Sequence, residues 1–204
     1  EGMGDFQGEV IHPQKWREDQ DYDGKRVAII GSGATAVTLV PAMIDKAAHV
    51  TMVQRSPTYI AGRPSRDMFA DAMRKILPES WAYSVSRTKN ILFSIFFYEL
   101  SQRWPGHVRG EVRKYIKGEL GDDFDVEKHF TPSYDPWDQR FCLAPDGDFF
   151  DALKTEKADI KTDGIERLTA SGLQLASGEH VDADIIIPAT GLEILLMGGI
   201  AFGV

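Results

Sequence analysis

The sequence predicts an α/β fold with a mainly parallel sheet, a helical insertion and a β-meander. The apolar run at residues 27–30 leads directly into Gly31 and Gly33 and then into an amphipathic helical pattern. A β-rich run at residues 49–54 follows and completes a β-α-β unit of the usual length. A further apolar run at residues 184–191 ends in small residues and indicates a buried parallel strand.

The turn after the first strand predicts a dinucleotide-binding site of the Rossmann type. Gly31 permits a tight turn, Gly33 lets the backbone approach a pyrophosphate, and Ala36 lets the helix pack on the strand. The helix N-terminus attracts phosphate through its unpaired N–H groups and its dipole. A glycine turn that serves packing only is the alternative, and the complete β-α-β unit favours nucleotide binding. The candidate cofactor contacts are Gly31, Ser32, Gly33, Ala34, Thr35 and Ala36.

The end of the second strand predicts a preference for NADP over NAD. An NAD site usually has an acidic residue there for the ribose 2′-hydroxyl, whereas this chain has Gln54, Arg55 and Ser56. A guanidinium and a hydroxyl can bind a 2′-phosphate, which a carboxylate would repel. The alternative is that Arg55 is a solvated charge at a strand end.

Composition excludes several classes of function. The 204 residues carry 23 Lys and Arg against 31 Asp and Glu, a net charge of −8, with no basic patch among aromatic residues, so we expect no nucleic-acid partner. Cys142 is the only cysteine, which excludes an intrachain disulfide, and the histidines are scattered, so we expect no metal site and a cytoplasmic location. The apolar run Ile91–Tyr98 is too short to span a membrane. We expect it to form a buried helix face, and membrane contact is the alternative that this interpretation disfavours.

Both ends of the chain favour an excised fragment. The sequence begins at Glu1 without an initiator Met and stops within the apolar run 195–204. An exposed apolar end is costly in a soluble protein, so we expect this run to dock or to continue.

The N-terminal segment carries four residues at fixed spacing, Phe6, Gly8, His12 and Trp16. They match the F-x-G-x-x-x-H-x-x-x-W fingerprint of Baeyer–Villiger monooxygenases, which are class B flavoprotein monooxygenases. The segment from Asp23 to Pro41 and the strand end from Gln54 onward are most similar to the ethionamide-activating subgroup. The fingerprint usually continues with Pro, where this chain has Arg17. The resemblance implies that His12 is a hinge or supporting residue between NADPH and FAD domains.

The resemblance also assigns a catalytic residue, Arg140, in a loop rich in aromatics and prolines. In the family, the arginine at this position lies over the flavin and stabilises the negative flavin peroxide and its adduct with a carbonyl. A fixed guanidinium suits that task because charge develops on oxygen. The preceding residue, which is Lys in many relatives, is Gln139 here. From spacing alone, Arg140 would be a loop arginine paired with Asp135 or Asp138.

The resemblance implies a division of the chain into parts. The return to the FAD domain resembles the family's A-T-G sequence at Ala189, Thr190 and Gly191, near the bound nicotinamide nucleotide. The parts are a linker at 1–24, an NADPH-binding domain at 25–191 with a helical insertion at 61–120 and an active-site loop at 121–150, and a truncated return to an absent FAD domain at 192–204.

The implied activity belongs to an intact enzyme in which NADPH reduces FAD and the flavin then activates O2 as a flavin peroxide. That species would oxygenate ketones to esters or lactones, or sulfur compounds to S-oxides. The chain has no second glycine-rich turn for FAD, so we expect it to be colourless and inactive alone and to need the FAD domain of the same chain. The alternatives are an N-hydroxylating or flavin-containing monooxygenase, which Trp16 and the loop from Trp137 disfavour, and a non-enzymatic NADP-binding sensor.

Overall fold

A computed structural model describes residues 2–192 of the chain, which divides into two compact units. The first unit runs to Arg55 and resumes at Lys157, and the second comprises Ser56–Glu156. Residues 193–204, which contain most of the predicted return to an FAD domain, lie outside the described residues.

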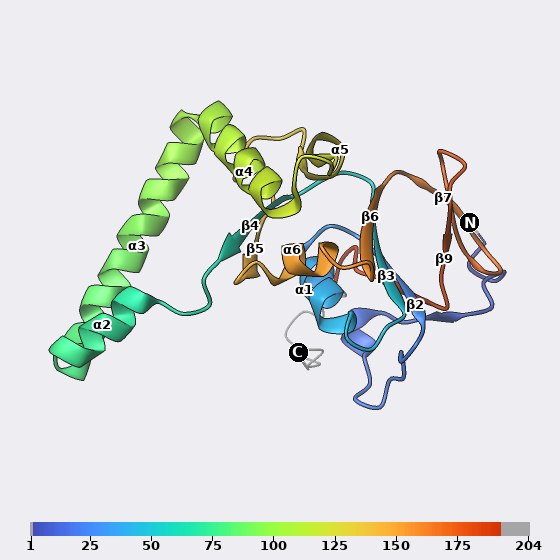
Figure 1. Cartoon of the computed structure of the whole chain (residues 1–204), viewed down its shortest axis with the longest axis horizontal. Coiled ribbons are helices and arrows are strands. Elements are labelled where there is room, and N and C mark those ends of the chain that lie inside the picture. The colour runs from blue at the N-terminus through green and yellow to red at the C-terminus, as the bar shows by residue number, and fades with distance from the viewer. Residues whose placement is uncertain (1, 193–204) are drawn as a thin grey trace, which may run out of the picture. The chain divides into compact units, whose positions relative to one another are not determined.

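The first unit is built on a five-stranded sheet in which every pair of neighbouring strands is parallel (Figure 1). Its strand order is β1-β10-β2-β3-β6. The short 3-10 helix η1 (Pro13–Lys15) follows β1, and α1 (Ala34–Met43) connects β2 to β3. The strands are β1 (Glu9–Val10), β2 (Arg26–Ile30), β3 (His49–Gln54), β6 (Ala158–Thr162) and β10 (Ile185–Pro188).

Both faces of this sheet are covered. An antiparallel meander packs through Leu173 and Leu175 against Ala28 of β2. Because side chains alternate along a strand, Val27 and Ile29 point to the other face, and α1 packs on β2 and β3. Apolar strands buried on both faces are typical of parallel sheets. The meander consists of β7 (Ile165–Thr169), β8 (Gly172–Leu175) and β9 (His180–Asp182).

The second unit combines a two-stranded parallel sheet with five helices. Strand β4 (Tyr59–Arg63) pairs with β5 (Phe141–Pro145). Aromatic residues fill much of the core, where Phe130 contacts Phe149 and Phe150. The helices are α2 (Met68–Ile76), α3 (Glu79–Arg103), α4 (Pro105–Leu120), α5 (Val126–Phe130) and α6 (Asp148–Leu153).

The predicted α/β class is confirmed, with a mainly parallel sheet, helices and antiparallel strands. The segment 121–150 is less loop-like than its prolines suggest, because it contains α5, β5 and the start of α6. Strand β5 is difficult to predict from the sequence, because it is only five residues long and lies in a proline-rich segment. Its pairing with β4 identifies it as a strand.

The prediction of a buried helix face at Ile91–Tyr98 is wrong for the described chain. Phe93 and Phe96 of α3 expose 61% and 62% of their surface. Helix α3 contacts α2 and α4, and its buried residues are the small Ala82, Ser86 and Ser101. A continuous apolar run covers every side of a helix, so packing along one side leaves the others exposed. None of the described helices combines the length and apolar character that a membrane span requires.

Candidate nucleotide-binding site

Gly31 connects the carboxyl ends of three neighbouring strands. Its N–H donates to the carbonyl of Val53 in β3 at 2.8 Å, while the N–H of Ala189, just after β10, donates to the carbonyl of Ile30 at 2.8 Å. Gly31 has φ +133, and a Cβ at this position would lie 2.7 Å from the Ala189 carbonyl oxygen. Glycine is therefore required both by the backbone conformation and by the close approach of the chain after β10.

Gly33 differs from Gly31, because its Cβ position is open. It is the N-cap of α1 with extended backbone, φ −82 and ψ −179, and a Cβ would meet nothing within 4 Å. No side chain caps this end of α1, and its first turn contains no acidic residue. The open space and the uncapped N–H groups fit a pyrophosphate.

The remaining residues of the turn divide into packing and exposed positions. Ser32 and Ala36 are buried, and Ala36 is fully enclosed between α1 and the sheet. Thr35 is half-buried, whereas Ala34 is exposed at the first position of the helix. The small residue at 36 thus allows α1 to lie close to the strand, as the sequence pattern predicts.

The end of β3 presents one enclosed and one exposed side chain. Gln54 is 2% exposed, and its amide Nε2 donates to the hydroxyl of Thr162 in β6 at 2.8 Å, so this side chain joins two strands. Arg55 is exposed, and within the described residues its guanidinium forms no ion pair. Arg55 is consequently available to a ligand, whereas Gln54 already has a structural partner.

The structure brings three predicted groups together at one edge of the sheet. These are the glycine turn after β2, the end of β3 and the segment after β10, where Thr190 and Gly191 are exposed. Ser56, Gln139 and Arg140 belong to the second unit, where all three are exposed.

The fingerprint residues pack locally in the first unit. The ring of Phe6 lies against Gly8 and joins the apolar cluster between the sheet and the meander. A Cβ on Gly8 would overlap with this ring and with the carbonyl oxygen of Asp184. His12 caps η1 by accepting a hydrogen bond from the Gln14 N–H at Nδ1, 3.3 Å away. The ring of Trp16 lies 5.8 Å from that of Tyr22.

Two tyrosines, Tyr59 and Tyr134, hold the segment before Arg140 through two linked hydrogen bonds. Tyr59 is buried in β4, and burial raises the pKa of its phenol, so it stays a donor at neutral pH. Its hydroxyl donates to the Tyr134 carbonyl at 2.8 Å, and the Tyr134 hydroxyl donates to the Arg140 carbonyl at 2.9 Å. These bonds fix the backbone of Arg140 and leave its guanidinium exposed.

Neither acidic neighbour predicted for Arg140 pairs with it. Asp135 instead forms an ion pair with Arg109 of α4, and the described residues include no ion pair to Arg140. Trp137 adopts φ +72, uncommon for a residue with a side chain, and stacks on Phe141 with ring centres 5.2 Å apart. Sequence reasoning missed this support, although the density of aromatic residues at 134–141 was a signal for it.

Residues 2–192 contain neither a candidate metal site nor an exposed cysteine. No group of three or more His, Cys, Asp or Glu side chains among residues 2–192 could hold a metal ion. Cys142 is buried, and burial raises the pKa of its thiol, so a reactive thiolate is disfavoured.

The chain is similar in sequence to flavin-dependent enzymes. A family model described as flavin-binding monooxygenase-like matches residues 1–89. The probable FAD-binding monooxygenase AlmA of Acinetobacter baylyi is 56% identical over 96% of this chain and 39% of its own length. The FAD-containing monooxygenase EthA of Mycobacterium tuberculosis is 52% identical over 97% of this chain and 41% of its own. The chain spans about two fifths of the length of these relatives.

Solved structures share the fold. A steroid monooxygenase, in a structure described as oxidized and bound to NADP, matches with a TM-score of 0.71 and 21% identity. It covers 93% of this chain, and the match spans 43% of that structure. OTEMO in complex with FAD and NADP matches with a TM-score of 0.72 and 19% identity, over 93% of this chain and 44% of its own. These structures show that the fold is shared, and the sequence similarity to AlmA and EthA confirms the predicted resemblance to flavoprotein monooxygenases.

Proposed function

We propose that this chain, a relative of the flavin-binding monooxygenases over nearly its whole length, is the NADPH-binding part of such an enzyme. The observation that carries the proposal is the pair of glycines at the end of β2. Gly31 has a conformation and a close contact that only glycine accepts, whereas Gly33 leaves open space before an uncapped helix. A packing turn would explain Gly31 alone, and a bound pyrophosphate explains both.

In this proposal, each group at the edge of the sheet has a separate task. The N–H groups at the start of α1 bind the pyrophosphate, and the Arg55 guanidinium binds the 2′-phosphate. Gln139 supplies no positive charge, so Arg55 accounts for more of the NADP preference than in relatives with Lys there. Ala189, Thr190 and Gly191 would lie along the nucleotide toward its nicotinamide end.

Replacing Arg55 by alanine tests this assignment. We expect the affinity for NADPH to fall at least about 10-fold and the affinity for NADH to stay unchanged, because a charge-assisted hydrogen bond contributes roughly 1.5–3 kcal/mol. Isothermal titration calorimetry measures both affinities. Arg167→Ala is the matched control, because Arg167 is an exposed arginine in the meander. Equal loss of NADPH and NADH binding would contradict the 2′-phosphate assignment.

We propose that FAD binds outside residues 2–192, in the remainder of the intact enzyme. Along the described strands, the one glycine-rich strand-to-helix turn is that of β2 and α1, which the proposal gives to NADPH. FAD, when bound, supplies hydride acceptance from NADPH and activation of dioxygen. We therefore expect this chain alone to be colourless and inactive, and flavin that co-purifies tightly with it would contradict this expectation.

Arg140 is the residue of this chain that we assign to the oxygenation step. Its backbone is held by Tyr134 while its guanidinium is free of ion pairs in the described residues, so the positive charge can stabilise charge that develops on a substrate oxygen. Ketones, giving esters or lactones, and sulfur compounds, giving S-oxides, are the proposed substrates. The relatives named as monooxygenases support the reaction class.

Two other functions predict different results for Arg140→Ala in the intact protein. A Baeyer–Villiger type enzyme should retain NADPH binding and lose oxygenation of ketones and sulfides, whereas a nucleotide sensor should lose neither binding nor its response. An N-hydroxylating or flavin-containing monooxygenase would oxidise amines in preference to ketones. Product analysis with a ketone, a sulfide and an amine separates these outcomes.

A further inference from the structure

The segment that carries Arg140 is built on a pair of stacked rings. It runs from Tyr134 to Phe141, where β5 begins, and lies with β4, α3 and α4 in the second unit. Phe141 pairs in register with Tyr59 of β4, and the two rings stack with their centres 5.7 Å apart. Because both residues belong to paired strands, their rings form a fixed base for the segment between Tyr134 and Phe141.

Trp137 adds a third ring to this base and connects it to helix α3. The Trp137 ring centre lies 5.2 Å from that of Phe141, with 13° between the two planes. Phe97 of α3 meets both rings edge to face, with its centre 6.3 Å from that of Trp137 and 6.0 Å from that of Phe141. Aromatic pairs at these separations attract one another beyond the effect of burial. The contacts therefore hold Trp137 at φ +72, a conformation that residues with a side chain rarely adopt.

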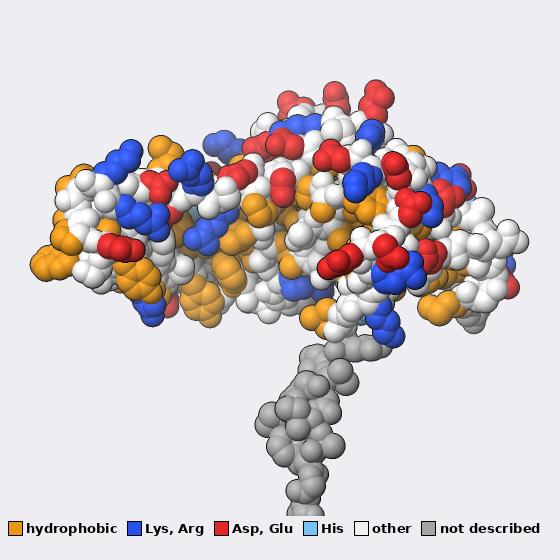
Figure 2. Space-filling view, turned by 90° about the horizontal axis from the view of Figure 1, so that it is seen from below, with side chains coloured by type: hydrophobic (Ala, Val, Ile, Leu, Met, Phe, Trp, Pro, Cys, Tyr) orange, Lys and Arg blue, Asp and Glu red, His pale blue; other side chains and the backbone are white. Residues whose placement is uncertain are grey.

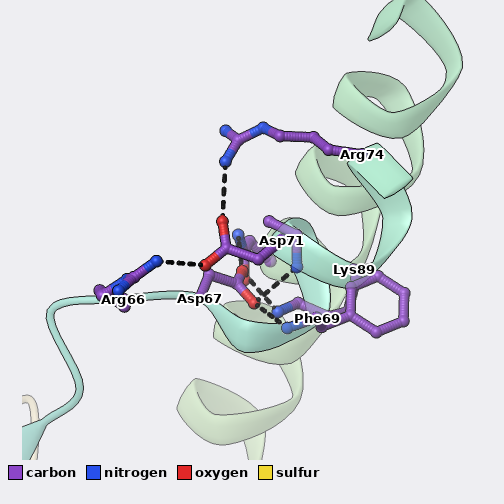
Figure 3. A network of polar contacts seen from close by, with 8 residues as sticks. Arg66, Asp67, Phe69, Asp71, Arg74 and Lys89 are labelled. Atoms are coloured by element: carbon purple, nitrogen blue, oxygen red, sulfur yellow. Dashed lines mark hydrogen bonds and ion pairs between the residues drawn. The ribbon is translucent and has the colours of Figure 1, made fainter. Parts of the chain in front are cut away.

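Phe97 differs from the other large apolar residues of this part of α3. It is half-buried, whereas Phe96 is 62% exposed, and Figure 2 shows hydrophobic side chains at the surface of this helical part. Helix α2 is joined to α3 by Asp67, whose carboxylate accepts hydrogen bonds from Lys89 at 2.7 Å and Asn90 at 3.1 Å (Figure 3). The same carboxylate caps the first turn of α2. Phe97 therefore projects from a helix that is itself supported.

Polar contacts attach the same segment at further points. The Asp135 carboxylate forms an ion pair with Arg109 of α4, which also interacts with the phenol of Tyr59. The Tyr134 hydroxyl donates to the Arg140 carbonyl at 2.9 Å, while the Tyr134 carbonyl accepts from the Tyr59 hydroxyl at 2.8 Å. All of these partners belong to one unit, so the contacts do not depend on any surface of that unit being free in the intact protein.

We propose that Tyr134 and Trp137 are positioning residues for Arg140, and that helices α3 and α4 act on the oxygenation step through them. This inference rests on the proposed function, which assigns Arg140 to that step. A guanidinium stabilises developing charge best when it is held in place before the reaction, and a misplacement of about 1 Å can lower a rate on the order of 100-fold. The Tyr134 hydroxyl bonds to the backbone of Arg140 itself, and Trp137 orders the chain three residues before it.

Tyr134→Phe in the intact enzyme loaded with FAD tests the role of the hydroxyl. Phenylalanine keeps the ring that packs 5.4 Å from Tyr59 and removes the donor to Arg140. The probes are cyclohexanone and methyl phenyl sulfide, and the one that the wild type oxidises faster is used. We expect kcat for product formation to fall about 2–10-fold, the scale of one hydrogen bond, while the affinity for NADPH stays unchanged.

Hydrogen exchange followed by mass spectrometry gives a second readout that needs no turnover. Amides of residues 135–142 should exchange about 2–10-fold faster in Tyr134→Phe than in the wild type, and amides of the first unit should exchange equally in the two proteins. Tyr115→Phe is the matched control, because it removes the hydroxyl of a tyrosine in α4 that packs on Phe150. The control should match the wild type in kcat and in the exchange of residues 135–142.

Two substitutions of Trp137 test the role of the rings. Trp137→Ala removes the contacts with Phe141 and Phe97 and should lower kcat at least about 10-fold. Trp137→Phe keeps an aromatic ring on Phe141 and should recover most of this loss. A loss in Trp137→Phe as large as that in Trp137→Ala would contradict positioning by ring stacking.

Arg140→Ala separates a failure of this inference from a failure of the proposed function. If Arg140→Ala loses at least about 100-fold in kcat and Tyr134→Phe matches the wild type, Arg140 keeps its role and positioning by Tyr134 is wrong. If Tyr134→Phe speeds exchange throughout the second unit and weakens NADPH binding, Tyr134 supports the fold in general, which also overturns the inference. If Arg140→Ala retains oxygenation, the assignment of Arg140 fails, and positioning fails with it.

Discussion

Replacing Gly31 by alanine should destabilise the first unit by about 2–6 kcal/mol. The backbone at φ +133 costs a residue with a Cβ on the order of 1–3 kcal/mol. The new Cβ would lie 2.7 Å from the Ala189 carbonyl oxygen and 3.1 Å from its carbon. Both atoms belong to backbone hydrogen-bonded to Ile30, so relief requires a strand end to move, at a further cost of roughly 1–3 kcal/mol.

Thermal unfolding followed by circular dichroism measures this effect. For a chain of 204 residues each kcal/mol shifts the midpoint by about 2–4 °C, so we expect a decrease of roughly 4–24 °C. Gly33→Ala is the matched control, because Gly33 has φ −82 and open space at the Cβ position. Its cost should stay below about 1 kcal/mol, the scale of a poorer N-cap. Equal midpoints for the two variants would refute the assignment of distinct roles to these glycines.

Two further variants test the packing of the fingerprint and the helix pair. Gly8→Ala should destabilise the first unit by about 1–3 kcal/mol, because its Cβ would overlap with the Asp184 carbonyl and the Phe6 ring. Gly4→Ala is the control and should cost little, because the space around Gly4 is open. Equal stability of the two variants in thermal unfolding would contradict this prediction. Hydrogen bonds from Lys89, the Ala70 N–H and Asn90 hold the pKa of Asp67 well below its usual range. The contribution of the Asp67 carboxylate to the free energy of unfolding should be complete above its unfolded-state pKa of about 4 and should decline as the pH falls further. Asp67→Asn should lack this decline. Identical dependence of stability on pH in the two proteins would contradict the stabilising role of the Asp67 carboxylate.

The sequence was most informative where local chemistry determines the structure. The turn at Gly31 and the apolar strands before and after it predicted the parallel sheet, because both the turn and the burial of these strands require particular residue types. The β-meander was likewise expected from the sequence, and β7, β8 and β9 form it.

The sequence was least informative where distant residues decide the outcome. Apolarity alone predicted burial of Ile91–Tyr98, but burial needs a partner on every side, and α3 is packed on small residues such as Ala82. The support of Arg140 depends on Tyr59, 81 positions earlier in the chain, and no local pattern connects the two. The side-chain bond from Gln54 to Thr162 is hidden for the same reason.

The most direct test of nucleotide binding is a titration of NADPH into the wild type and Gly33→Ala. A methyl group on Gly33 occupies space that nothing in the described fold fills, so stability without nucleotide should be nearly unchanged. We predict that Gly33→Ala weakens NADPH binding at least about 10-fold, because the added Cβ keeps the pyrophosphate from the helix N-terminus. Equal affinity in the two proteins, or no binding to the wild type, would contradict the account.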